Sequence, residues 1–323
     1  MNNYQHTPEA PFALSMNAYT PQQTTEICSR VGTKKANMSI DKVFFSSFIA
    51  GCYLAFSSSV CLVINTSPWY QENAPGLIRM IAALVFPLSL VMIVLTGTDL
   101  CTGSFMYTTL AALHRRISPV KMLMHWFLTF FGNLAGSLFI VGIIIGYGGV
   151  LDDPLYRKEA IAFAEKKAYT PQWHQIFLRA IGANWLVCVA CWLAFQARDV
   201  AGKIMGIWWP VFAFVALGLD HVVANMYFIP MGIFLGSTHI SVGYYIWKSM
   251  IPAALGNIVG GGLFVAVIHW YLVSVAFLLR SNLKKKTCSN STFQDLTGVD
   301  EPIAIDGSLH KGDRKDENSS VDV

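Results

Sequence analysis

Six apolar segments dominate this sequence, and each is long enough to cross the hydrocarbon core of a membrane. A helix needs about 20 residues for such a crossing. Only 13% of the 323 residues are charged, against about 25% in soluble domains. We therefore predict an all-α membrane protein with six transmembrane helices. The segments cover approximately residues 43–65, 77–113, 122–146, 176–195, 204–235 and 250–279.

Two of these segments contain an interruption that a continuous helix does not favour. Gly97 and Asp99 lie in the second segment, and Gly218 and Asp220 lie in the fifth. Glycine lowers helix stability by about 1 kcal/mol, and aspartate competes for nearby backbone groups. Non-helical backbone inside a membrane persists only where it lines a cavity or is buried in protein. We therefore predict that the second and fifth helices are broken, with these four residues in structural roles.

The aspartates at the two breaks have two possible roles. They are expected to cap the helices that restart after each break, by accepting hydrogen bonds from the first free backbone N–H groups. Direct contact with a transported anion is the alternative, and charge repulsion disfavours it.

The two halves of the chain repeat one pattern, in which a Gly-x-Asp break precedes a Gly-Asn-x-x-Gly motif. Because each half contains three crossings, the second copy has the opposite orientation in the membrane. We expect two inverted three-helix repeats whose breaks meet at the midplane, where the half-helix N-termini favour an anion. The matching motifs are Gly97-x-Asp99 with Gly132-Asn133-x-x-Gly136, and Gly218-x-Asp220 with Gly256-Asn257-x-x-Gly260.

His221 directly follows the second aspartate. It is the only histidine that lies both deep in a predicted span and at a helix break. An ionisable side chain at this depth indicates function by default, and imidazole titrates nearest to physiological pH. A core histidine bonded to a backbone carbonyl is the alternative. Asn133, Asn184 and Asn257 lie beside glycines in other spans, where we expect them to bind the broken backbone or to line the path.

Two phenylalanines lie in the helices that lead into the breaks. Phe86 and Phe214 are expected to form apolar constrictions above and below the histidine, which would exclude hydrated ions by dewetting. Ordinary packing of aromatic side chains is the alternative.

Basic residues cluster on one side of the predicted membrane domain, near residues 34–35, 114–121, 198–203 and 280–286. The positive-inside rule makes this side cytoplasmic, with both termini inside. We expect a cytoplasmic tail over residues 1–40 that ends in an amphipathic stretch. A channel domain over 41–282 and a disordered cytoplasmic tail over 283–323 complete the expected organisation.

The residue pattern disfavours several other classes of protein. The basic residues follow no aromatic-studded groove, so a nucleic-acid partner is not expected. Cys188 and Cys191 have no second pair of ligands, and no three-ligand metal cluster stands out. A membrane oxidoreductase or haem carrier would need paired histidines that face each other across spans. We therefore expect no metal, no cofactor and no enzymatic activity.

Several linked motifs closely resemble the formate/nitrite transporter family over residues 25–280. The resemblance implies a homopentamer of aquaporin-like protomers in the bilayer, each with a pore for a small monovalent anion. The motifs are Thr96-Gly97-Thr98-Asp99-Leu100-Cys101-Thr102-Gly103, Phe131-Gly132-Asn133-Leu134-Ala135-Gly136, Asp220-His221-Val222-Val223-Ala224-Asn225-Met226, Ile229-Pro230-Met231-Gly232, and Ile251-Pro252 with Gly256-Asn257-Ile258-Val259-Gly260-Gly261-Gly262.

The resemblance also implies roles for single residues. His221 matches the central histidine, and Thr102 matches the threonine after the first break. Lysines on the two sides of the pathway would concentrate anions at its entrances. Lys166 is the alternative to Lys167 as the outer lysine. Arg179 adds an outer charge without an assigned role. The remaining matches are Phe86, Leu90 and Phe214 for two constrictions, Asn184 and Asn257 for the pore lining, and Lys167 and Lys35 for the outer and inner lysines.

The expected function is uptake of formate across the plasma membrane, coupled to protons through His221. Protonation of formate to formic acid removes the cost of many kcal/mol for carrying a bare charge through an apolar constriction. Nitrite, or lactate or acetate, is the alternative substrate, and a neutral-solute channel is a more distant alternative.

Overall fold

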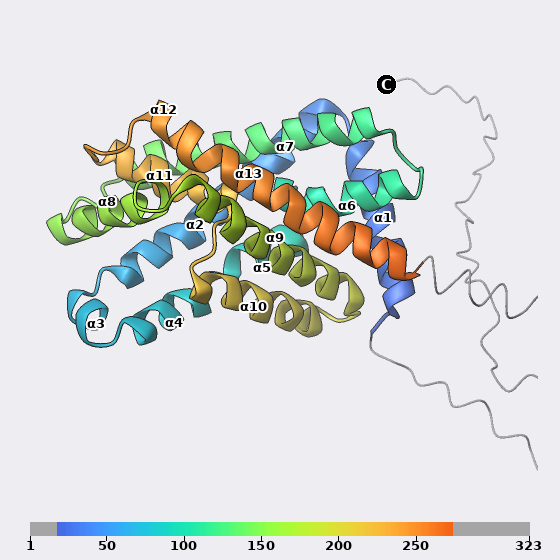
Figure 1. Ribbon diagram of the computed structural model, residues 1–323, viewed down its shortest axis with the longest axis horizontal. Coiled ribbons are helices and arrows are strands. Elements are labelled where there is room, and N and C mark those ends of the chain that lie inside the picture. Colours follow the sequence, from blue (N-terminus) through green and yellow to red (C-terminus); the bar gives the residue numbers. More distant parts are fainter. Residues whose placement is uncertain (1–17, 274–323) are drawn as a thin grey trace, which may run out of the picture. The chain divides into compact units, whose positions relative to one another are not determined.

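The computed structural model describes residues 18–273, whose regular structure is almost entirely helical (Figure 1). Six helices in this range are long and apolar enough to cross a membrane, as the sequence predicts. The sixth begins eight residues earlier than expected. The spans are Ile40–Asn65, Pro75–Thr96, Pro119–Tyr147, Trp173–Gln196, Val200–Leu217 and Val242–Val273.

The helices form two sets that follow one another along the chain and repeat the same order. The first set comprises α1 (Pro21–Ala36), α2 (Ile40–Asn65), α3 (Pro68–Asn73), α4 (Pro75–Val85), α5 (Leu88–Thr96), α6 (Cys101–Leu113), α7 (Pro119–Phe139) and the π-helical η1 (Ile140–Tyr147). The second set comprises α8 (Pro154–Ala168), α9 (Trp173–Gln196), α10 (Val200–Leu217), α11 (Val222–Phe234), α12 (Val242–Tyr245), η2 (Ile246–Met250), α13 (Ile251–Ile258) and η3 (Val259–Val267).

Both predicted breaks are present, and a glycine in the left-handed region ends the helix before each one. Gly97 ends α5 with φ of 75°, and Gly218 ends α10 with φ of 71°. Other residues adopt this conformation only at a steric cost, which is why glycine commonly terminates helices. After each break the chain restarts as a short helix of 13 residues, α6 or α11.

Glycines bring the long helices of each half into close contact. A side chain at Gly136 in α7 would collide with the backbone oxygen of Phe48 in α2. At Gly256 in α13 it would collide with the backbone oxygen of Phe177 in α9. Close backbone approach through small residues is typical of membrane helices, and here it fixes α2 against α7 and α9 against α13.

The N-terminal region differs from the expected tail. Residues 21–36 form α1, which begins at a Thr20 capping box and packs on α6 through the fully buried Cys28 and through Gly32. The part of the expected tail over residues 21–36 is therefore helical and packed on the membrane domain. The remainder of the two expected tails, residues 1–17 and 283–323, lies outside the described residues.

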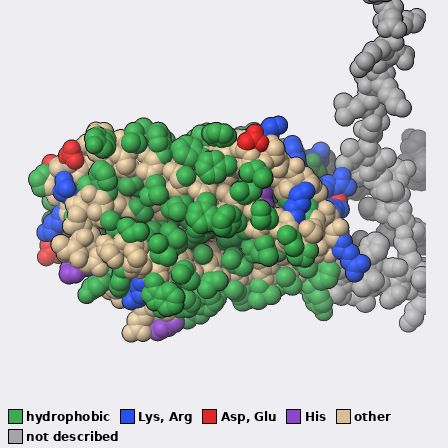
Figure 2. Space-filling view, turned by 90° about the horizontal axis from the view of Figure 1, so that it is seen from above, with side chains coloured by type: hydrophobic (Ala, Val, Ile, Leu, Met, Phe, Trp, Pro, Cys, Tyr) green, Lys and Arg blue, Asp and Glu red, His purple; other side chains and the backbone are tan. Residues whose placement is uncertain are grey.

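The surface of the described domain matches a membrane setting. Figure 2 shows hydrophobic side chains over the middle of one face, with charged side chains gathered toward its two ends. Large apolar side chains such as Phe45 and Phe127 are about two-thirds exposed. Water penalises such exposure, whereas lipid does not, so this surface fits a bilayer.

Candidate functional site

The two breaks meet through a hydrogen bond between His221 and Thr102. His221 is the N-cap residue of α11, and Thr102 lies in the first turn of α6. Their Nε2 and Oγ1 atoms are 2.8 Å apart, and both residues are buried. The N-termini of the two half-helices therefore face each other at the centre of the domain, as the repeat predicts.

The position of the single proton on the His221 ring follows from its second contact. Nδ1 accepts a hydrogen bond of 3.2 Å from the backbone N–H of Ala224. A nitrogen that accepts such a bond carries the lone pair, so the proton of the neutral ring lies on Nε2. Nε2–H then donates to Thr102 Oγ1, and the threonine hydroxyl hydrogen remains free to donate to a third group.

Asparagines, and not the predicted aspartates, cap the restarting helices. Asn133 Oδ1 accepts from the backbone N–H of Cys101, and Asn257 Oδ1 accepts from that of Val222, each at 2.8 Å. The Nδ2 groups bind broken backbone, donating to the carbonyl oxygens of Asp99 at 3.0 Å and Asp220 at 3.1 Å. The prediction that Asp99 and Asp220 cap these helices is therefore wrong.

The aspartate carboxylates instead hold two lysines. Lys167 Nζ lies 3.1 Å from Asp220 Oδ1 and donates to the carbonyl oxygens of Gly218 at 3.2 Å and Leu219 at 3.0 Å. Carbonyls at the end of a helix have no partner within the helix and carry partial negative charge. The lysine neutralises this charge as well as the carboxylate.

Lys35 occupies the same position at the other break. Its Nζ atom lies 3.4 Å from Asp99 Oδ1 and donates to the carbonyl oxygens of Gly97 at 3.3 Å and Thr98 at 3.1 Å. The ammonium groups of both lysines therefore contact two backbone carbonyls and a carboxylate. Their first role in this structure is to hold the breaks together.

Asn184 joins the two halves close to the central pair. Its Nδ2 donates to the carbonyl oxygens of Thr102 at 3.1 Å and Asn257 at 2.6 Å. Its buried Oδ1 has no hydrogen-bond partner among the described residues. An acceptor of this kind normally finds a partner, so this oxygen is available to the donor group of a ligand.

The two predicted gate phenylalanines touch each other. Their ring centroids are 5.7 Å apart and the rings are perpendicular, and Phe214 also lies 5.9 Å from the His221 ring. The expectation of one phenylalanine above and one below the histidine is therefore wrong, because Phe86 and Phe214 form a single layer. Behind this layer is a cavity of about 10 Å³, lined in part by Leu90 and Leu100, with room for about one water molecule.

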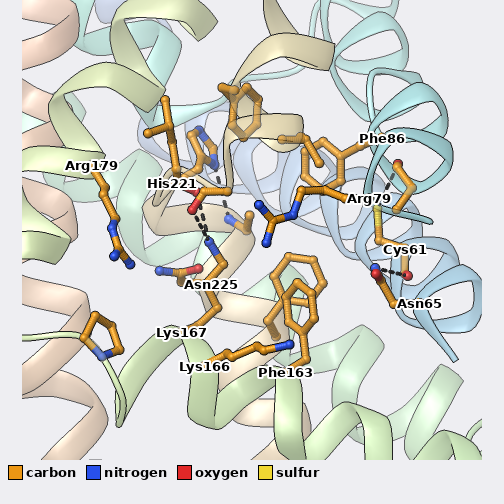
Figure 3. A pocket seen from close by; sticks show the side chains of 18 of the residues that line it. Cys61, Asn65, Arg79, Phe86, Phe163, Lys166, Lys167, Arg179, His221 and Asn225 are labelled. Carbon is orange, nitrogen blue, oxygen red and sulfur yellow. Dashed lines mark hydrogen bonds between the residues drawn. The ribbon is translucent and has the colours of Figure 1, made fainter. Parts of the chain in front are cut away.

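A much larger cavity, of about 410 Å³, opens on the Lys167 side of the phenylalanine layer (Figure 3). We call this cavity the vestibule. Its base includes Phe86, Phe214 and His221, and its walls carry Lys166 and Lys167 from α8. Both Lys166 and Lys167 line this cavity, so the choice between them as the pathway residue stays a prediction.

Three polar features of the site do not follow from the sequence interpretation. Arg79 from α4 lines the vestibule, and so does Arg179, to which the sequence assigns no role. Arg79 follows the start of a transmembrane helix by four residues, which resembles an ordinary interfacial anchor. His125 of α7 lies 3.1 Å from Asp99 Oδ2 through its Nε2. The sequence feature that could have identified His125 as a structural or functional residue is its position within an apolar segment.

Metal binding has no support in the described part of the chain. Residues 18–273 contain no group of three His, Cys, Asp or Glu side chains placed to hold a metal ion. The six cysteines in this range are free and buried.

An inverted pair of broken-helix repeats around a narrow central path defines a membrane channel or transporter, and not an enzyme. The sequence profile of the formate/nitrite transporter family matches residues 22–271. The chain belongs to this family, as its sequence motifs indicate.

Individual relatives support the assignment. A probable formate transporter of Methanothermobacter thermautotrophicus is 37% identical over 265 residues, which cover 78% of this chain and 96% of the relative. A formate channel of Haemophilus influenzae is 31% identical over 278 residues, covering 80% and 96%. A solved pentameric formate channel with formate bound matches with a TM-score of 0.64 at 28% identity, covering 72% of this chain and 97% of that one.

Proposed function

We propose that this protein carries formate and related small monovalent anions across the plasma membrane as a homopentamer, together with protons. The observation that carries the proposal is the bond of 2.8 Å between His221 and Thr102 at the base of the vestibule. The Thr102 hydroxyl of this pair is free to donate a hydrogen bond to a permeating molecule in the apolar part of the path. The family supports anion transport, and relatives named as formate channels support formate.

Passage through the phenylalanine layer favours a neutral molecule. A bare carboxylate loses its hydration there at a cost of many kcal/mol, whereas formic acid does not. Cationic side chains in the vestibule gather formate, and its protonation then allows it to pass. Asn184 Oδ1, which has no partner among the described residues, is an acceptor for the O–H group of the acid.

The proton comes from the vestibule and not from the imidazole itself. The neutral His221 ring has one proton, on Nε2, because Nδ1 accepts from the Ala224 N–H. Releasing that proton would leave an imidazolate anion among apolar side chains, which is costly. Formate is therefore protonated beside His221, and the Thr102 hydroxyl, which Nε2–H orients, donates a hydrogen bond to the acid as it passes.

The positive-inside rule supports the orientation. The loop after α6 and the loop after α9 carry basic residues on the side of Lys35, which places that side in the cytoplasm. The vestibule then faces outward. The fivefold assembly is proposed from the structural neighbour named as pentameric.

Uptake of labelled formate into proteoliposomes tests the proposal, with outside pH varied from 5 to 7.5 and nitrite, acetate or lactate as competitors. We expect uptake to rise in acid and to collapse in His221→Asn, which shortens the side chain and removes the hydrogen bond to Thr102. His269→Asn is the matched control, because His269 bonds within its own helix to Val265.

Unchanged uptake in His221→Asn would refute a transport role for the histidine. Uptake that is independent of outside pH would refute proton coupling, and competition dominated by nitrite would assign the protein to nitrite transport.

A further inference from the structure

The vestibule carries more positive charge than a monovalent anion requires. Its lining includes Arg79 from α4, Lys166 and Lys167 from α8, and Arg179 from α9. Asp220 and two backbone carbonyls hold Lys167. The other three cations make no ion pair and no side-chain hydrogen bond with the residues that the structure describes. Their charge is therefore available to a ligand.

One carboxylate opposes these three cations. Glu159 of α8 lines the same cavity, so three unpaired cations less one carboxylate leave two positive charges. Burial raises the pKa of Glu159, while the hydrogen bond with Gln71 and the charge of Lys166 offset part of this effect. Its negative charge is therefore weakened as the pH falls. A ligand with two negative charges matches the cavity better than a ligand with one.

The geometry of the arginines narrows the class of ligand. Arg79 and Arg179 enter the cavity from opposite sides, and Lys166 reaches it from a third direction (Figure 3). A guanidinium group binds a carboxylate through two parallel hydrogen bonds. Two such groups on opposite sides fit a molecule that has a carboxylate at each end, and the volume of about 410 Å³ accommodates one with a few carbon atoms.

We propose that the vestibule binds small dicarboxylates between Arg79 and Arg179 and does not transport them. Crossing the phenylalanine layer as a neutral molecule would require protonation of both carboxylates, and the cavity beyond it holds only about 10 Å³. The bound dicarboxylate therefore occupies the entrance and blocks it. The blocking effect rests on the proposed transport of formate, whereas the binding does not.

Calorimetric titration of malonate into the purified full-length protein at pH 7 and low ionic strength tests the binding. We expect the double variant R79Q/R179Q to weaken binding by at least about tenfold, since it removes two charge-assisted pairs. Glu159→Gln removes the opposing charge and is expected to strengthen binding, an effect of opposite sign that loss of folding does not imitate. Lys158→Gln is the matched control, because Lys158 is exposed on α8 and does not line the vestibule.

Two comparisons decide between a dicarboxylate site and a general anion site. Sulfate has two charges but only one centre, and acetate has one carboxylate, so both should bind more weakly than malonate. Malonate affinity that is unchanged in R79Q/R179Q, or equal affinity for sulfate, would overturn the proposal.

A transport measurement tests the block separately. Malonate outside the proteoliposomes should inhibit formate uptake by the parent and much less by R79Q/R179Q. Malonate that binds without inhibiting uptake would refute the block. A parent that transports no formate would refute the proposed function, and the calorimetric result would still decide whether the dicarboxylate site exists.

Discussion

The two helix breaks are built on the same scaffold. We call them the Lys35 break (residues 97–100) and the Lys167 break (residues 218–221). In each, a left-handed glycine ends one helix, a lysine binds the two carbonyls that follow, and an asparagine from another span caps the restarting helix. Each lysine comes from the last turn of a helix outside the six spans, α1 or α8. Both halves therefore pair the exposed backbone groups of a broken helix in the same way, as backbone inside a membrane requires.

The breaks differ at the residue that precedes the restarting helix. Leu100 and His221 occupy this N-cap position with nearly the same backbone, at φ and ψ of −91° and 122° against −105° and 121°. Both side chains line the small cavity behind the phenylalanine layer. The same backbone position therefore carries an apolar wall residue in one half and an imidazole in the other. Of the two, only His221 also caps its helix, through Nδ1 and the N–H of Ala224.

The breaks also differ in how tightly the aspartate is held. Asp99 accepts from Ser104 at 2.7 Å and lies near both Lys35 and His125. The partners of Asp220 are Lys167 at 3.1 Å and Asn225 at 3.4 Å. Neither aspartate makes a hydrogen bond through Oδ2 with the described residues, but Asp99 Oδ2 has His125 Nε2 beside it at 3.1 Å. In the second half Ser249 stands where the repeat places His125, eight residues before the capping asparagine. Asp220 therefore depends more on its lysine than Asp99 does.

Removal of either capping asparagine should have the largest effect. Asn133→Ala removes the side-chain partner of the Cys101 N–H and of the Asp99 carbonyl, and Asn257→Ala does the same for the Val222 N–H and the Asp220 carbonyl. Each buried unpaired group costs about 1–3 kcal/mol, against a total stability of about 5–15 kcal/mol. We expect both variants to lose most of the folded protein on size-exclusion chromatography.

Asn73→Ala is the control, since Asn73 makes one exposed bond within α3. Good yields of only one of the two variants would show that the breaks are not equivalent in what holds them.

The scaffold could be predicted from the sequence more fully than the site. Six spans, two breaks and the inverted repeat follow from apolar length and from Gly-x-Asp motifs, which are local signals. The assignment of the caps failed because an aspartate beside a helix start is the usual local cap, whereas Asn133 approaches from another span. The place of Arg79 in the vestibule was missed, and Arg179 was left without a role, for a similar reason. Arg79 and Arg179 lie 100 residues apart and acquire a shared role only when α4 and α9 face one cavity.

The lysines should separate the two breaks. Lys167→Met leaves the buried Asp220 with the amide of Asn225, and removal of one partner of a buried ion pair costs about 3–5 kcal/mol. Lys35→Met should cost less, because Asp99 keeps Ser104 and His125. We expect a lower thermal midpoint for Lys167→Met than for Lys35→Met, measured on protein in detergent.

Exposed neighbours provide the controls, with Lys166→Met paired to Lys167 and Lys34→Met paired to Lys35. Addition of His125→Leu to Lys35→Met should abolish the difference between the breaks. A Lys35→Met variant as unstable as Lys167→Met would contradict a stabilising role for His125 at the Lys35 break.

Leu100, the N-cap residue at the Lys35 break, should affect which anions pass the small cavity. Leu100→Ala widens the wall opposite His221, and one methylene of extra space changes discrimination by about tenfold or more. We expect the ratio of acetate to formate uptake to rise by about tenfold. Leu110→Ala is the control, since Leu110 is equally buried on α6 and does not line the cavity. An unchanged ratio would remove Leu100 from the path.

The smallest effect concerns how each half anchors the helix that carries its lysine. Glu26 of α1 accepts from Arg116, just beyond α6, at 2.6 and 2.8 Å. In the second half, Arg157 of α8 donates to the carbonyl of Leu235, just beyond α11, at 3.3 Å. One anchor depends on a carboxylate and the other on a backbone oxygen, so only the first should respond to acid.

The pH dependence follows from the sign of the shift in Glu26. Burial raises the pKa of this carboxyl. The hydrogen bonds and charges of Arg116 and Arg30 together lower that pKa by more than burial raises it, so the pKa lies below its usual value. Its stabilising effect is therefore complete above the unfolded pKa of about 4.3 and disappears as the pH falls through the lower folded pKa. Because the pair is partly exposed and screened, Glu26→Gln should cost under about 1 kcal/mol at pH 7 and less near pH 3. Arg157→Ala should lower the thermal midpoint equally at both pH values, and a Glu26→Gln effect that persists undiminished in acid would show that α1 is anchored by packing alone.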